Sequence, residues 1–178
     1  MKINNIKSDL VYLFINYFVA YIPCWIVRKF FYILFGMKIG HNSRIAMKCI
    51  VMSPSKIKIG ENTIINEHCL LDGRGELELG NNNSISMFSK IYTCSHISNS
   101  NDFGVFCKKT IVKDNCWIGT SSITMPGSYI DDFTIVSVNS VFKGVSEKKG
   151  IYVGNPSKLV KTRKIEKKYK IDYKEWFR

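Results

Sequence analysis

The sequence has few of the residues that build metal or redox sites. Its six cysteines form no CxxC pair, and it contains only three histidines. Zinc ribbons and thioredoxin-like sites need the CxxC spacing, so the sequence excludes both. His41, His68 and His96 are 27 and 28 residues apart and fall at different phases of the repeat described below, so they would not converge on one zinc ion. We expect no metal.

A cleavable signal sequence is also absent, which predicts a cytoplasmic protein with reduced thiols. The longest apolar stretch, residues 10–27, is near the minimum length for a membrane span, but it contains Asn16 and Pro23. We therefore expect residues 1–37 to form one or two helices that cap the rest of the chain. Peripheral contact with the inner face of the membrane and a true span are the open alternatives.

The chain also lacks a basic surface that could follow a nucleic acid. The net charge is +12, but residues 39–157 contain twelve basic and ten acidic residues, whereas residues 158–178 contain nine and three. The excess therefore lies at the ends of the chain, and we expect no nucleic-acid partner.

What the sequence does contain is a six-residue repeat between residues 39 and 147. An apolar residue recurs at every sixth position, and a small residue follows it four places later. The clearest run of apolar positions is Val112, Ile118, Thr124, Ile130, Val136 and Phe142. No helix or ordinary strand repeats at six, whereas the coils of a solenoid do, each burying its apolar face against its neighbours. With eighteen residues per triangular coil, residues 38–157 make about five coils.

Three further features belong to this solenoid. Cys49, Cys69 and Cys116 occupy small positions of the repeat, where they should pack as small hydrophobes. Residues 92–111 interrupt the repeat as one long loop that contains His96 and is polar at its start, and loops on a rigid scaffold often carry the chemistry. After Pro156 the chain leaves the coils, and residues 158–178 are predicted to form a basic helix that caps the last one.

Several motifs make the repeat more specific. They are the IGxN corners, CSH at residues 94–96, KDNCWIGTSSITMPGSYIDD at 113–132 and VGNPSKLVK at 153–161. Together they resemble the hexapeptide-repeat acyltransferase superfamily, in particular bacterial sugar O-acetyltransferases of surface-polysaccharide synthesis and galactoside and maltose acetyltransferases. The resemblance covers residues 38–161. It implies an all-β solenoid, a left-handed parallel β-helix, that forms a homotrimer and uses acetyl-CoA as co-substrate.

The resemblance also implies the catalytic residues. His96 matches the general base of the family, which takes the proton from the acceptor hydroxyl, and neutral histidine suits that role. Either Glu76, which lies one coil beneath His96 by counting along the repeat, or Asp102 in the same loop would orient the imidazole. Relatives bind the acceptor sugar with polar side chains of the coil below, which points to Asn66 and Asp72, although both residue types also suit turns.

The coenzyme site implied by the resemblance lies in the fourth and fifth coils. In relatives, backbone groups near WIG and the following coil contact the pantetheine arm, and basic side chains lie near the phosphates. The corresponding residues here are Trp117, Gly119, Thr120, Ser137, Val138, Lys143 and Lys158. The chain departs from the family where VSVNS at 136–140 replaces smaller residues, which narrows or reshapes the expected channel.

We therefore expect an acetyl-CoA-dependent O-acetyltransferase that acts on a sugar hydroxyl in surface-polysaccharide biosynthesis (O-antigen, capsule or exopolysaccharide), by direct attack without a covalent enzyme intermediate. Two alternatives stay open from the sequence: an acetyltransferase for a small amino acid or drug hydroxyl, and a β-helix scaffold that has lost its cofactor.

Overall fold

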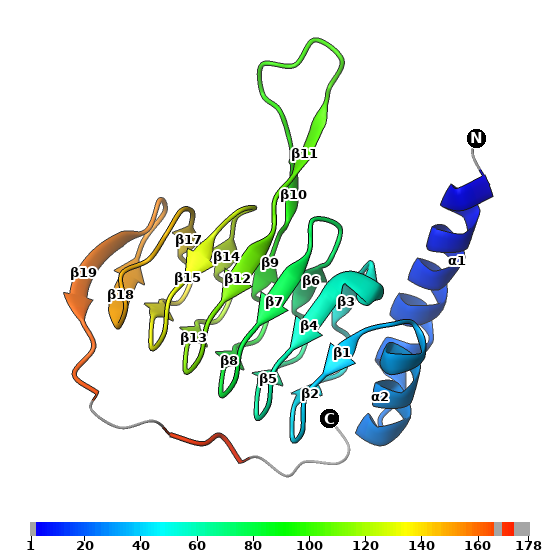
Figure 1. Ribbon diagram of the computed structural model, residues 1–178, viewed down its shortest axis with the longest axis horizontal. Helices are drawn as coiled ribbons and strands as arrows, with labels where there is room; N and C mark the ends of the chain where they lie inside the picture. The colour runs from blue at the N-terminus through cyan, green and yellow to red at the C-terminus, as the bar shows by residue number, and fades with distance from the viewer. Residues whose placement is uncertain (1–2, 166–168, 173–178) are drawn as a thin grey trace.

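The computed structural model describes residues 3–165 and 169–172, with only the backbone for residues 3–5. Two helices are followed by a triangular β-solenoid (Figure 1). The helical segment consists of α1 (Ile3–Tyr17), the single turn η1 (Val19–Tyr21) and α2 (Trp25–Leu34). It packs against the first coil, as the sequence predicted, and no helix within the described residues is long and apolar enough to cross a membrane.

Three parallel sheets form the sides of the solenoid. The first sheet contains β1 (Lys38–Ile39), β4 (Ile57–Ile59), β7 (Leu77–Leu79), β12 (Thr110–Val112) and β15 (Tyr129–Ile130). The second contains β2 (Arg44–Ile45), β5 (Ile64–Ile65), β8 (Ser84–Ile85), β13 (Trp117–Ile118), β16 (Ile135–Val136) and β18 (Gly150–Val153). The third contains β3 (Ile50–Met52), β6 (Leu70–Asp72), β9 (Lys90–Ile91), β14 (Ile123–Thr124) and β17 (Val141–Phe142). These strands complete five coils, and Val145, which forms a bridge with Tyr129, and β18 add two sides of a sixth.

The predicted apolar positions form the core in the predicted register. In the second sheet, for example, Ile45, Ile65, Ile85, Ile118 and Val136 pair in succession along the ladder, and all are fully buried. The three predicted thiols of the repeat, those of Cys49, Cys69 and Cys116, are also buried. The six-residue pattern therefore identified the interior correctly in every coil.

The corners between the sheets repeat their geometry from coil to coil. The first corner joins the first and second sheets, the second joins the second and third, and the third leads back to the first sheet. Asn42, Asn62, Asn82 and Asn115 occupy the same place at the first corner, with φ between 53° and 60°. Asparagine tolerates this left-handed conformation better than most residues, which explains its recurrence there.

The glycines at the first corner have a different role from these asparagines. Gly60 does not have positive φ, but a Cβ on it would lie 2.7 Å from the carbonyl carbon and oxygen of Gly80 in the next coil. Glycine at this position therefore allows successive coils to stack closely.

The two ends of the solenoid are closed differently. At the first coil, Asn16 of α1 donates from Nδ2 to the Val51 carbonyl (2.9 Å) and accepts from the Val51 N–H (2.7 Å), so it pairs with the free edge of β3. At the last coil, β19 (Lys158–Thr162) pairs antiparallel with β18. The prediction of a helix from residue 158 is therefore wrong for the described part of that segment. The open edge of β18 offers backbone partners that a strand can use and a helix cannot. Residues 166–168 and 173–178 of the predicted helix lie outside the described residues.

Replacing Asn16 tests the cap. Asn16→Leu should lower the free energy of unfolding by about 2–3 kcal/mol, because it leaves the buried N–H and C=O of Val51 without partners. Leu13→Asn, at a position that is 49% exposed on the same helix, should change it by less than about 0.5 kcal/mol. Urea denaturation followed by circular dichroism measures both. Equal losses for the two variants would contradict the proposed role of Asn16.

Candidate active site

His96 lies on a β-hairpin that leaves the solenoid at the third corner. The hairpin consists of β10 (Cys94–His96) and β11 (Val105–Cys107), which pair antiparallel with His96 opposite Val105. It projects well beyond the coils (Figure 1). The coil resumes at Thr110, whose N–H donates to the Glu76 carbonyl (3.0 Å). The predicted loop is thus an ordered insertion between β9 and β12.

The ring of His96 is held by Phe103. Its Nδ1 lies 3.1 Å from the Phe103 carbonyl oxygen, and the two rings stack with centroids 3.9 Å apart. A carbonyl oxygen can only accept, so Nδ1 carries the hydrogen in this contact and, in neutral imidazole, Nε2 keeps a free lone pair. The side chain of His96 is exposed. The arrangement therefore presents an oriented base to the outside of the hairpin.

The two carboxylates predicted to orient His96 do not contact it among the described interactions. Counting along the repeat placed Glu76 beneath His96. In the structure, however, Leu77 of β7 pairs with Thr110 of β12, so the preceding residue, Glu76, lies beside the point where the hairpin returns to the coil and not beneath His96. The count failed because the chain leaves the coil before it reaches His96. Asp102 accepts a hydrogen bond from Ser100 Oγ, which is the main cause that lowers the pKa of Asp102. It therefore belongs to the turn at the tip of the hairpin.

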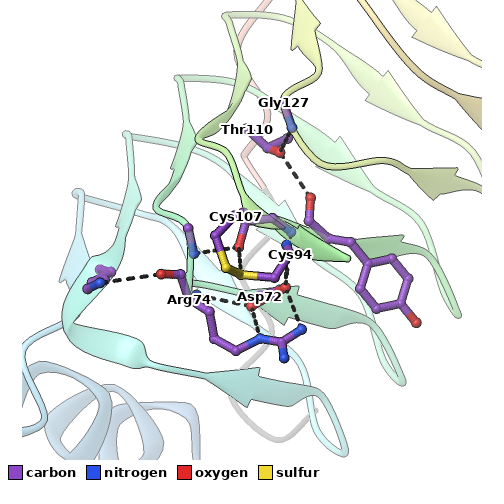
Figure 2. The surroundings of a disulfide bond; sticks show 10 residues. Asp72, Arg74, Cys94, Cys107, Thr110 and Gly127 are labelled. Atoms are coloured by element: carbon purple, nitrogen blue, oxygen red, sulfur yellow. Dashed lines mark hydrogen bonds and ion pairs between the residues drawn. A yellow bond between two sulfur atoms is a disulfide. The ribbon is translucent and has the colours of Figure 1, made fainter. Parts of the chain in front are cut away.

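A disulfide between Cys94 and Cys107 closes the base of the hairpin (Figure 2). The two residues form a cross-strand pair with their Cα atoms 4.1 Å apart. The prediction of reduced thiols is wrong for this pair. Cys24, Cys49, Cys69 and Cys116 are free, and burial raises the pKa of Cys116 to about 12. The pairing could not be read from the sequence, because it depends on a hairpin register inside a segment that has no repeat.

Asp72 fixes the point where the hairpin begins. Its side chain is fully buried, and Oδ2 accepts hydrogen bonds from the N–H groups of Thr93 (3.0 Å) and Cys94 (3.2 Å). Arg74 donates from Nε to Oδ1 (2.9 Å) and from Nη2 to Oδ2 (3.1 Å), as Figure 2 shows. Burial raises the pKa of Asp72, but the hydrogen bonds from Arg74 and Thr93 outweigh it and hold the pKa below its usual value. Asp72 is not exposed to a sugar, so its predicted binding role is corrected to a structural one.

Asn66, the other residue predicted to bind the sugar, is partly accessible. It is half-buried at the second corner, and its Nδ2 donates to the Ile85 carbonyl (2.9 Å). No contact in the described structure links Asn66 to His96, which lies at the third corner.

Five of the predicted coenzyme residues gather at the second corner. Trp117 is 47% exposed, and its Nε1 donates to Ser86 Oγ of the coil below (2.9 Å). Gly119 stacks on the next coil so closely that a Cβ would lie 2.6 Å from the Val138 nitrogen. Val138 is 61% exposed. Thr120 and Ser137 follow β13 and β16 at the same corner.

The two predicted lysines lie elsewhere. Lys143 follows β17 at the third corner, the corner that carries the hairpin. Lys158 belongs to β19, where it is opposite Val153. Both side chains are exposed. A single chain therefore places His96 and Lys143 at one corner of the triangular solenoid and Trp117, Gly119 and Val138 at another.

The three histidines lie at three different corners. His41 is between β1 and β2, His68 is between β5 and β6 and stacks on Phe88 (4.9 Å between centroids), and His96 is on the hairpin. Within the ranges 3–165 and 169–172, no three His, Cys, Asp or Glu residues are grouped so that they could hold a metal ion.

Replacing Asp72 tests the anchor of the hairpin. Asp72→Asn should lower the free energy of unfolding by about 1–3 kcal/mol at pH 7, because the amide oxygen is a weaker acceptor than the carboxylate for the N–H groups of Thr93 and Cys94. A carboxyl whose pKa is lower in the folded protein stabilises it above pH ~4, and that contribution is lost as the pH falls through the folded pKa. The difference between wild type and Asp72→Asn should therefore shrink from pH 7 to pH ~3 in urea unfolding. If the difference in the free energy of unfolding does not depend on pH, the ionised carboxylate of Asp72 is not what anchors the hairpin.

Comparison with known proteins adds to this geometry. No protein-family model matches the chain. It is 31% identical over 137 residues to an Escherichia coli (strain K12) protein assigned as the putative colanic acid biosynthesis acetyltransferase WcaF. The aligned segment covers 76% of this chain and 75% of the relative.

Two solved structures share the fold. A maltose O-acetyltransferase from Clostridium difficile 630 superposes with a TM-score of 0.82 at 20% identity, covering 92% of this chain and 90% of that one. The hexapeptide-repeat-containing acetyltransferase VCA0836 from Vibrio cholerae, in complex with acetyl-CoA, gives 0.77 at 23% identity, covering 89% and 86%.

Proposed function

Because the chain belongs to the hexapeptide-repeat acetyltransferases, we propose that it moves an acetyl group from acetyl-CoA to a hydroxyl group of a sugar in the biosynthesis of a surface polysaccharide. The observation that carries the proposal is the hairpin, which holds His96 with Nδ1 bound to a carbonyl and Nε2 free. The colanic acid relative supports a polysaccharide as the product. The cytoplasm, where acetyl-CoA is made and used, is the proposed compartment, and the Cys94–Cys107 disulfide is unusual for a protein of that compartment.

His96 acts as the general base. Nε2 takes the proton of the acceptor hydroxyl as that oxygen attacks the carbonyl carbon of the thioester. The new C–O bond forms, the C–S bond breaks, and the thiolate of coenzyme A takes the proton back from the imidazolium. The Phe103 carbonyl fixes the tautomer and stabilises the imidazolium through Nδ1, the role that a carboxylate has in other triads.

The coenzyme lies at the second corner. The exposed indole of Trp117 and the small residues Gly119 and Ser137 leave the backbone open to a pantetheine arm, and Thr120 and Val138 border it. Lys143 and Lys158 supply positive charge for the phosphates as point charges. Asn66, three coils below Ser137 in the same column, would contact the sugar.

The active site forms between two subunits of a homotrimer. The side chains of different corners of a triangular prism diverge, so His96 and Trp117 of one chain point away from each other. Three copies around an axis bring the third corner of one subunit to the second corner of the next. Each site then combines the hairpin of one chain with the coenzyme corner of its neighbour.

Removal of the imidazole tests the base. His96→Ala should lower the rate of acetyl transfer by a factor of about 100 or more, because general base catalysis contributes about that much, without loss of the folded trimer. His41→Ala, at an exposed histidine of the first corner, should retain wild-type activity. Thiol release from acetyl-CoA measures the rate, and light scattering checks assembly. Activity near wild type in His96→Ala would remove His96 from the mechanism.

Mixing two inactive variants tests the shared site. Val138→Trp should block the coenzyme corner, and His96→Ala should remove the base. In trimers reassembled from equal amounts of both, one interface of each mixed trimer has both parts intact, so about a quarter of the wild-type activity should return. No recovery would mean that His96 and the second corner of the same chain form the site.

The acceptor is found with the same assay. Nucleotide sugars, lipid-linked glycans, serine and a chloramphenicol-like alcohol are offered in parallel with acetyl-CoA. Thiol release with the sugars alone supports the proposal, whereas release with serine or the drug indicates a small-molecule acetyltransferase. If calorimetry detects no binding of acetyl-CoA, the chain is a scaffold without catalytic function.

A further inference from the structure

Helix α1 has a second apolar stripe, whose side chains are about half exposed or more in the described structure. Val11 and Ile15 face the first coil. On the opposite side Ile6, Leu10, Leu13 and Tyr17 follow one another at intervals of four, three and four residues, which places them in one line along the helix. They are 43%, 60%, 49% and 63% exposed. A helix in contact with water on this side would carry polar residues there.

Helix α2 has a charged side chain on its buried side and apolar side chains on its exposed side, the opposite of a helix at a water-exposed surface. Arg28 is fully buried on the side of the solenoid, where its guanidinium donates to the carbonyls of Ile22, Pro23 (2.7 Å) and Ile45 (3.0 Å). The outward side instead presents Ile26 and Phe30, which are 58% and 62% exposed. The charge points into the protein and the apolar side chains point out, which is the arrangement expected when the surroundings of the helix are apolar.

The two helices and the turn between them form one continuous face. It lies beyond the first coil at the end of the solenoid, away from the strands (Figure 1). Phe18 and Tyr21 of the connecting segment are 66% and 54% exposed and line a shallow apolar groove together with Tyr17 and Phe31. We call the surface made by Leu10, Leu13, Tyr17, Phe18, Ile26 and Phe30 the end face.

We propose that the end face lies on the surface of an anionic phospholipid bilayer, with both helices parallel to the membrane plane. Neither helix is long enough to span, so insertion stops at the boundary between headgroups and acyl chains. Tyrosine and phenylalanine at the rim suit that boundary, since their rings are apolar and the tyrosine hydroxyl stays in contact with water.

The charges near the end face favour an anionic lipid surface, and not a second copy of the chain, as the partner of that face. Asp9 is the one acidic residue among residues 1–38, which contain five basic ones. Of these Arg28 is buried, whereas Lys7 and Lys29 lie on α1 and α2 and are not. Lys7 borders a groove between α1 and the solenoid that also contains Lys56 of the neighbouring corner, so positive charge collects beside α1. Anionic headgroups complement these lysines, whereas a symmetric dimer through the same face would bring like charges together.

Flotation on a density gradient tests the proposal with the full chain. Vesicles of phosphatidylcholine with about one quarter phosphatidylglycerol should carry the protein upward, and vesicles of phosphatidylcholine alone should carry less, because the lysines then lack anionic partners. Leu13→Ser with Phe30→Ser should lower the bound fraction by about tenfold or more, since both side chains are exposed and contribute apolar area to binding. The matched control is Val145→Ser with Val160→Ser, at exposed positions near the other end of the solenoid, which should float like the wild type.

Two results would overturn the proposal. One is equal flotation of the Leu13→Ser, Phe30→Ser variant and the control. The other is a wild-type protein that binds neither vesicle but forms assemblies larger than a trimer in light scattering, which the double variant disperses; a second copy would then cover the end face. Thiol release with a soluble acceptor, measured without vesicles, does not depend on docking, so a failure of the proposed enzymatic function would be seen separately.

Discussion

Each coil of this protein is stabilised by the coils on either side of it. A coil of about twenty residues is too short to enclose a core, so its inward side chains are buried by stacking on their equivalents, such as Ile85 between Ile65 and Ile118. The backbone groups of its strands likewise bond to the neighbouring coils, as Ile64 N–H does to the Asn83 carbonyl. The first and last coils therefore each have one side without a partner. Asn16 and Arg28 supply polar partners to β3 and β2 at one end, and β19 supplies a strand at the other.

The same constraint decides where an insertion can occur. The chain can leave a coil only at a corner and must return in register, or every later inward side chain would be displaced. The hairpin meets this condition through contacts at its base: Lys108 N–H donates to the Thr93 carbonyl, the disulfide joins Cys94 to Cys107, and Asp72 binds the backbone of residues 93 and 94. His96 is only two residues beyond the disulfide. It is therefore exposed, yet it is attached to the most tightly bonded part of the insertion.

The six-residue repeat made the fold predictable from the sequence. The predictions that failed concern residues outside the repeat or residues whose partners lie outside it. Residues such as Ile45 and Ile118 could be assigned to the core because the period of six is set by the coil itself. Predictions failed where that period was carried past the end of a coil, as for Glu76 beneath His96, or where a partner came from outside the repeat. Asp72 looked like a ligand for a sugar because nothing in the sequence shows that the hairpin begins directly above it. The helix expected from residue 158 followed from local spacing, but the open edge of β18 decided the outcome.

The shape of the solenoid also determines how it can support a reaction. A triangular prism is convex, and residues on its different corners cannot converge within one chain. His96 and the group around Trp117 are on different corners, so the proposed base and the proposed coenzyme corner do not meet within one chain. In an enzyme of two domains, the residues of one active site can come from both domains and meet in the cleft between them. In a rigid prism, residues of different corners can meet only in a groove between two copies. The hairpin that carries His96 projects beyond the coils (Figure 1), so it would be available to a neighbouring subunit in the proposed trimer. Catalysis and assembly would then depend on the same contacts, and any change that separates the subunits should remove the activity even when each solenoid stays folded.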